Sequence, residues 1–130
     1  MLRPDFTKQE KTSTAKEKAA ALQTEIYSLA SDMPKADCPS IATQMSDSIT
    51  RVTEYLYMIE DSYINQNYNP KHEFLQHGIK VEIKMLTLLS KLAHERNILD
   101  GEQFESLSDQ IEECRQILFL PPLAQNLKQA

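Results

Sequence analysis

The chain has 130 residues, 41% of them hydrophobic and 25% charged, which is the composition of one globular domain. Only 2 glycines occur, which argues against a sandwich or barrel of strands, because tight turns between strands usually need glycine. Lys and Arg number 14 against 19 Asp and Glu, and the resulting net charge of −5 does not favour non-specific binding to nucleic acid or to anionic membranes.

The chain begins with a segment that has no helical period. Residues 1–12 carry mixed charge and are predicted to form a flexible N-terminal arm. A helix is predicted over 13–32, because apolar residues then recur at alternating steps of four and three, the spacing of one helix face. These residues are Ala15, Ala19, Leu22, Ile26, Leu29 and Met33. Pro34 ends the helix, since proline cannot continue the helical hydrogen bonding.

A second helix is predicted over residues 39–65, after a loop over 34–40 that contains two prolines. Its apolar stripe consists of Ile41, Met45, Ile49, Val52, Leu56, Ile59 and Tyr63. The sequence NQNYNP over 65–70 is typical of a turn. Within it, Asn69 can cap the next helix, with Pro70 at the first helical position.

A third helix is predicted over residues 70–96 with two sets of apolar positions. The main stripe, expected to face the core, consists of Phe74, Gly78, Val81, Met85, Leu88 and Leu92. Leu75, Leu86 and Leu89 widen this stripe, so the helix is expected to contact two neighbouring helices.

The fourth helix is predicted over residues 101–119, after a connection over 97–101. Asp100 followed by Gln103 has the spacing of a capping box, in which each side chain accepts a hydrogen bond from the other residue's backbone N–H. The core stripe of this helix consists of Phe104, Leu107, Ile111, Cys114 and Leu118. Residues 121–130 begin with two prolines and are predicted to be a polar C-terminal tail.

These segments have similar lengths and short connections, which favours neighbours that run in opposite directions. The predicted fold is therefore all-α, an antiparallel up-down-up-down four-helix bundle over residues 13–120. Each apolar stripe supplies part of one shared core.

Two runs of apolar residues exceed what one core face can bury. Residues 55–59 (YLYMI) and 117–120 (ILFL) are continuous, although neighbouring residues on a helix point about 100° apart. A thick core with a few exposed tyrosines is one interpretation. The other is a second buried face supplied by another copy of the chain, with Tyr55, Met58 and Phe119 in the oligomer interface.

Basic residues of the third predicted helix form a ridge. Lys80, Lys84 and Lys91 recur at steps of four and seven, with Arg96 at the end of the helix. Such a ridge is often a solvated helix face, and it can also contact phosphates or an acidic partner. These four residues are the predicted contacts to a partner or to RNA.

The sequence shows no pattern of catalytic, cofactor-binding or metal-ligating residues. No glutamate has a histidine three residues later, which excludes the Glu-x-x-His motif of di-iron bundles. Cys38 and Cys114 are 76 positions apart and match no metal or redox spacing, so two free thiols are expected. The sequence has no apolar run long enough to span a membrane, so the chain is expected to be cytoplasmic. Because the motifs are missing, it is also expected to have no enzymatic activity, cofactor or metal.

Several short segments along the chain form a recognisable series: 26–30 (IYSLA), Met33-Pro34, Gln44-Met45, 88–93 (LLSKLA), 98–100 (ILD), Gln103-Phe104 and 111–113 (IEE). This series resembles a family of small bacterial four-helix bundle proteins that are encoded in intervening sequences of large-subunit ribosomal RNA. The branch that the chain resembles most is the accessory variability determinant of diversity-generating retroelements. Members of that branch are usually basic, whereas this chain is acidic.

The resemblance implies a non-enzymatic homopentameric ring that binds a reverse transcriptase and supports cDNA synthesis primed by the template RNA. It implies that Lys80, Lys84, Lys91 and Arg96 contact the enzyme or RNA, and that Tyr55 and Met58 face neighbouring subunits. A second hypothesis is a regulatory or adaptor bundle that binds another protein through the apolar helix over 39–65, without nucleic acid. A third is an enzyme that uses Cys38.

Overall fold

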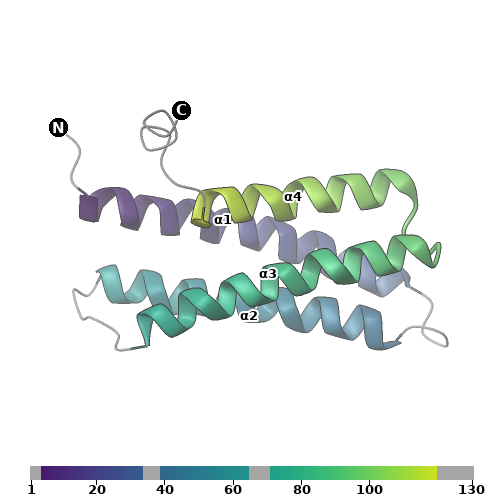
Figure 1. Cartoon of the computed structure of the whole chain (residues 1–130), viewed down its shortest axis with the longest axis horizontal. Helices are drawn as coiled ribbons and strands as arrows, with labels where there is room; N and C mark the ends of the chain where they lie inside the picture. Colours follow the sequence, from purple (N-terminus) through teal and green to yellow (C-terminus); the bar gives the residue numbers. More distant parts are fainter. Residues whose placement is uncertain (1–3, 34–38, 65–70, 120–130) are drawn as a thin grey trace.

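The computed structural model describes residues 4–33, 39–64 and 71–119, and these form four helices. They are α1 (Pro4–Asp32), α2 (Pro39–Ile64), α3 (His72–Glu95) and α4 (Gly101–Phe119), with no strand in the described ranges. The helices lie lengthwise beside one another (Figure 1). The all-α prediction with four helices is confirmed, and the bounds of α2, α3 and α4 agree with the predicted ones within two residues.

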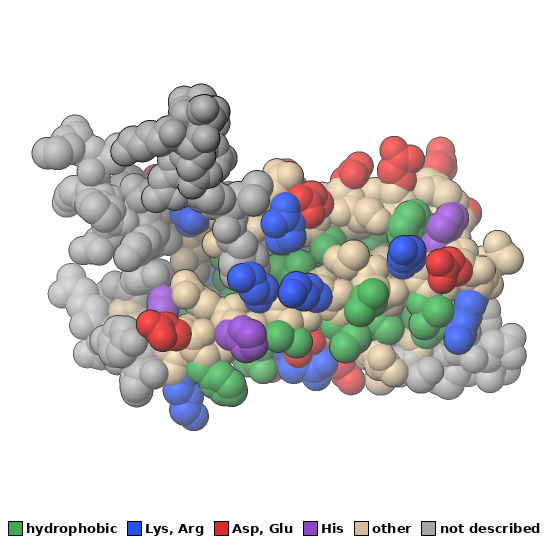
Figure 2. Space-filling model, viewed as in Figure 1, with side chains coloured by type: hydrophobic (Ala, Val, Ile, Leu, Met, Phe, Trp, Pro, Cys, Tyr) green, Lys and Arg blue, Asp and Glu red, His purple; other side chains and the backbone are tan. Residues whose placement is uncertain are grey.

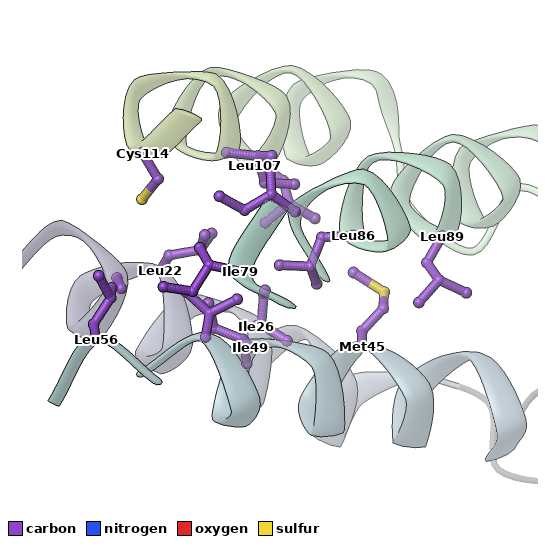
Figure 3. Close-up of a cluster of buried hydrophobic side chains, with 14 of the residues drawn as sticks. Leu22, Ile26, Met45, Ile49, Leu56, Ile79, Leu86, Leu89, Leu107 and Cys114 are labelled. Carbon is purple, nitrogen blue, oxygen red and sulfur yellow. The ribbon is translucent and has the colours of Figure 1, made fainter. Parts of the chain in front are cut away.

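Each helix contacts two others: α1 and α3 both pack against α2 and against α4. The contact of α3 with two neighbours was predicted and is confirmed. Side chains from all four helices meet in one core, where Leu22, Ile49, Leu86 and Leu107 point toward one another (Figure 3). Along α1 and α2, Lys16 hydrogen-bonds to Glu60, whereas Tyr27 lies eleven residues later and hydrogen-bonds to Thr50.

The predicted apolar stripes of α1, α2 and α4 face this core. Their buried members are Ala15, Ala19, Leu22, Ile26, Met33, Ile41, Met45, Ile49, Val52, Leu56, Ile59, Leu107, Ile111 and Cys114. Leu29, Phe104 and Leu118 are partly buried against them. The side chain of Tyr63 lies outside the described residues.

The prediction of a flexible arm over residues 1–12 is wrong for residues 4–12, which belong to α1. This stretch has no glycine, and Pro4 suits the first position of a helix. The helix therefore continues where its apolar period is lost, and Thr12 is already buried. Residues 1–3, the loop that contains Cys38 and the tail over 121–130 lie outside the described residues.

The prediction for the inward face of α3 is also wrong. Its buried apolar side chains are Leu75, Ile79, Ile83, Leu86, Leu89 and Ala93. Most of the predicted main stripe faces outward instead, with Phe74, Val81, Met85 and Leu88 exposed. Both sets of positions have helical spacing, so periodicity could not rank them. The inward set is rich in leucine and isoleucine, whereas the outward set includes Gly78, which has no side chain to bury.

The connection between α3 and α4 is fixed by backbone hydrogen bonds. Ile98 N donates to Ala93 O at 2.8 Å and Asn97 N to His94 O at 3.0 Å, which is the Schellman arrangement at a helix C-terminus. The predicted capping box is confirmed: Gln103 N donates to Asp100 Oδ1 at 2.8 Å, and Asp100 N to Gln103 Oε1 at 3.0 Å. These bonds set the direction in which α4 leaves α3.

Asn97 has a φ of 62°, the left-handed conformation that this C-terminal arrangement needs. We expect Asn97→Ala to destabilise the protein by at most about 1–2 kcal/mol, because both residues carry a Cβ that crowds the following carbonyl but alanine lacks the local hydrogen bonding by which asparagine tolerates this conformation. Asn97→Gly, the control, is expected to be at least as stable as the parent. Urea unfolding checks both variants, and an alanine variant as stable as the glycine variant would contradict the expectation.

Candidate interaction surface on helix α3

The outward side of α3 carries a row of exposed apolar side chains, which we call the apolar stripe: Phe74, Val81, Met85 and Leu88. Phe74 is 68% exposed and Leu88 62%. Together with Gly78 and the partly buried Leu92, the positions follow alternating steps of four and three along the helix. Figure 2 shows hydrophobic side chains in this row on the face that α3 presents. A row of exposed apolar side chains of this kind is a candidate interaction surface.

Gly78 allows the apolar surface to continue from α3 onto α2. A Cβ built at Gly78 would lie 2.9 Å from Cε2 of Tyr55, so the tyrosine ring of α2 occupies the space that a side chain would take. Tyr55 is therefore half-buried within its own chain. The other predicted interface residue of α2, Met58, is 44% exposed. The side chain of Phe119 lies outside the described residues.

Basic side chains lie beside the apolar stripe. The predicted contacts Lys80, Lys84 and Lys91 are exposed. His77, Lys84 and Lys91 recur every seven residues, so they share one edge of α3, which we call the basic edge. Figure 2 shows lysine and arginine side chains next to the hydrophobic row. Arg96 is exposed as well, but it caps the C-terminus of α3, so the structure does not align it with the lysines.

A polar cluster between α2 and α3 fixes how α3 is turned about its axis. The carboxylate of Glu82 accepts hydrogen bonds from Ser48 Oγ at 2.6 Å and from Arg51 Nε at 2.7 Å. Burial by itself raises the pKa of Glu82, but the hydrogen bonds from Arg51 and Ser48 outweigh it and lower that pKa. The charged form is thus favoured in the folded protein. Glu82 points at α2, so its contacts agree with the burial of the leucines and isoleucines of α3 in leaving the apolar stripe on the outside.

A second polar cluster joins α1 to α2. Glu60 accepts hydrogen bonds from Lys16 Nζ at 2.5 Å and from Ser13 Oγ at 2.7 Å. The bond from Lys16 lowers the pKa of Glu60. The Lys16 ammonium also lies 4.9 Å from the ring centroid of Tyr57, a cation–π contact. This ring and its neighbour Met58 are the exposed large apolar side chains among the described side chains of α2.

Cys114 is buried on α4, and burial raises the pKa of its thiol to about 11, which keeps the thiol protonated and unreactive near neutral pH. The described ranges contain no cluster of three or more His, Cys, Asp or Glu that could hold a metal ion. None of the four helices, as far as the structure describes them, is long and apolar enough to cross a membrane.

Sequence reasoning singled out the apolar residues and the lysines of this surface but not His77, and it placed the apolar stripe in the core. The presence of two apolar stripes on one helix, of which a four-helix core needs one, signals that one stripe faces outward but not which one. No family model, curated protein or solved structure matches the chain.

Proposed function

We propose that the protein is a non-enzymatic accessory protein that binds another macromolecule through the outward face of α3. The observation that carries this proposal is the apolar stripe beside the basic edge. Removing an apolar row of this length from water lowers the free energy, and the binding of a partner achieves this. The residue patterns that resemble the accessory proteins of diversity-generating retroelements favour a reverse transcriptase as the partner.

The proposed architecture is an antiparallel up-down-up-down bundle. The order of the polar contacts supports it, because contacts of later residues in one helix go to earlier residues in its neighbour. Lys16 pairs with Glu60 and Tyr27 with Thr50 between α1 and α2. Between α1 and α4, Lys18 pairs with Glu113 and Glu25 with Gln110. This arrangement displays the whole length of α3 to a partner.

Self-association, with a pentamer as the proposed state, is part of this function. The exposed Tyr57 and Met58 of α2 support a contact between copies, and Tyr55 contributes only its half-exposed ring. Native mass spectrometry of the intact chain tests the assembly, and a monomer at micromolar concentration would contradict it. RNA is the alternative to a protein contact at Lys84 and Lys91, and a ring would repeat these lysines by symmetry.

Co-purification with a co-expressed reverse transcriptase of a diversity-generating retroelement tests the proposed function. Leu88→Ser is expected to reduce recovery of the enzyme, since it removes an exposed apolar contact without touching the core. Gln76→Ser, an exposed change on the same helix outside the stripe and the basic edge, is the matched control and is expected to bind normally. Undiminished binding by Leu88→Ser would rule out this face as the docking surface.

The alternative is an adaptor bundle that binds a protein without any nucleic acid. That alternative was expected to use the apolar helix α2, whereas the exposed apolar side chains of α3 support a protein contact on α3. A salt titration separates binding of RNA from docking of a protein. RNA binding through phosphates weakens steeply as salt rises, whereas docking of apolar surface changes little.

A further inference from the structure

We propose that the occupant of the α3 face is an amphipathic α-helix of a partner protein that carries acidic residues along one edge. This inference rests on the proposed function, because it gives the chemistry of the partner for the same surface. It follows from the register of the apolar positions, from the charge beside them, and from the poorer fit of a second copy of the chain or of RNA.

The register of the face is that of a coiled-coil seam. Phe74, Gly78, Val81, Met85, Leu88 and Leu92 alternate by four and three over a length of about 27 Å. A heptad repeat matches a second helix, whose own a and d positions recur with the same average spacing of about 3.5 residues. An extended strand has a period of two and cannot keep this register.

The charges specify the partner further. If the stripe supplies the a and d positions, then His77, Lys84 and Lys91 are the three successive g positions. The e positions are Leu75, Glu82 and Leu89; both leucines are buried, and Glu82 is bonded to α2. The face therefore has one free edge, which is basic, and glutamate or aspartate on the docking helix complements it.

Two other occupants fit the face less well. Two copies that paired through α3 in antiparallel fashion would place one basic edge against the other, which is repulsive. RNA would engage the lysines but leave Phe74, Val81, Met85 and Leu88 in water. An acidic amphipathic helix satisfies both parts of the face.

Two labelled synthetic peptides of three heptads test the inference. Both carry leucine at a and d; one has glutamate at every e and g position, and the other has lysine there. Like charges keep each peptide from pairing with itself. Fluorescence anisotropy with the full chain in about 50 mM NaCl is expected to show at least about tenfold tighter binding of the acidic peptide, with the difference shrinking at about 300 mM.

Variants assign the binding to this face. Leu88→Ser is expected to weaken the acidic peptide about tenfold, and Gln76→Ser to leave it unchanged. The double change Lys84→Glu with Lys91→Glu is expected to reverse the preference, so that the lysine peptide binds more tightly. Circular dichroism checks that each variant remains helical.

Each contrary result identifies what is wrong. Equal binding of the two peptides, both lost in Leu88→Ser, would overturn the acidic partner while leaving the proposed docking face intact. If neither peptide binds although Leu88→Ser reduces recovery of the reverse transcriptase, the helical partner is wrong and the function stands. Oligouridine binding that depends on Lys84 and Lys91 but not on Leu88 would replace the helix with RNA. A mass that falls to the monomer in Leu88→Ser would replace it with a second copy.

Discussion

Leu86→Ala is expected to destabilise the protein by about 2–5 kcal/mol, whereas Leu88→Ala on the same helix is expected to change stability by no more than about 0.5 kcal/mol. Leu86 is fully buried in the core, so its truncation loses apolar burial and leaves a cavity. Leu88 is 62% exposed, and its removal leaves no cavity. Urea unfolding of the two variants at one protein concentration measures both effects.

This pair tests which side of α3 faces inward, because the two leucines are two residues apart and differ in direction. Similar losses in both variants would mean that Leu88 is buried, either in the core or by another copy of the chain. Repeating the unfolding at a higher protein concentration separates these two cases, since only the second depends on concentration.

Glu82→Ala is expected to destabilise the protein by about 1–3 kcal/mol, the cost of leaving a buried polar group without a hydrogen-bond partner. Ser48 is fully buried and donates to Glu82, so its hydroxyl loses its partner. Arg51 loses a charged partner too, but it is 43% exposed and can be hydrated. The effect is measured by urea unfolding at neutral pH.

Two further measurements make this expectation specific. Ser48→Ala is expected to cost less in the Glu82→Ala background than in the parent, because the shared hydrogen bond is already gone. The cost of Glu82→Ala is also expected to shrink in acid. Since folding lowers the pKa of Glu82, its carboxylate stabilises the fold above the ordinary glutamate pKa, and this contribution is lost as the pH falls through the lowered value. A cost independent of pH would contradict the role of the charged form.

The helices and their ends could be predicted from local signals. Pro39 marks the start of α2, and Asp100 with Gln103 forms the capping box before α4. The start of α1 could not be predicted, because residues 4–12 have no apolar period. They extend, at its N-terminal end, a helix whose apolar stripe begins only at Ala15. Which side of α3 faces inward is a tertiary property, because it depends on contacts with other helices. Among them are the hydrogen bonds of Glu82 with Ser48 and Arg51 of α2, which lie more than thirty positions earlier in the chain.

The composition of the candidate surface was predictable, but its position was not. Lys84 and Lys91 were assigned to a contact surface from their spacing, and they lie beside the stripe as exposed residues. Phe74 and Leu88 were assigned to the core because apolar residues are usually buried. Tyr55 was assigned to an interface because it belongs to an apolar run. Its ring fills the space beside Gly78, and no local signal in the sequence connects these two residues.

The fit of Tyr55 over Gly78 makes the recognition face a composite of two helices. A larger residue at position 78 would push the phenol aside and change the relief that a docking partner meets, even though every contact-making side chain of α3 stayed the same. Replacement of Tyr55 by a smaller residue would leave a gap beside Gly78, midway along the apolar stripe. Binding specificity in this protein can therefore evolve through substitutions in α2, a helix in which substitutions would otherwise be expected to affect only stability.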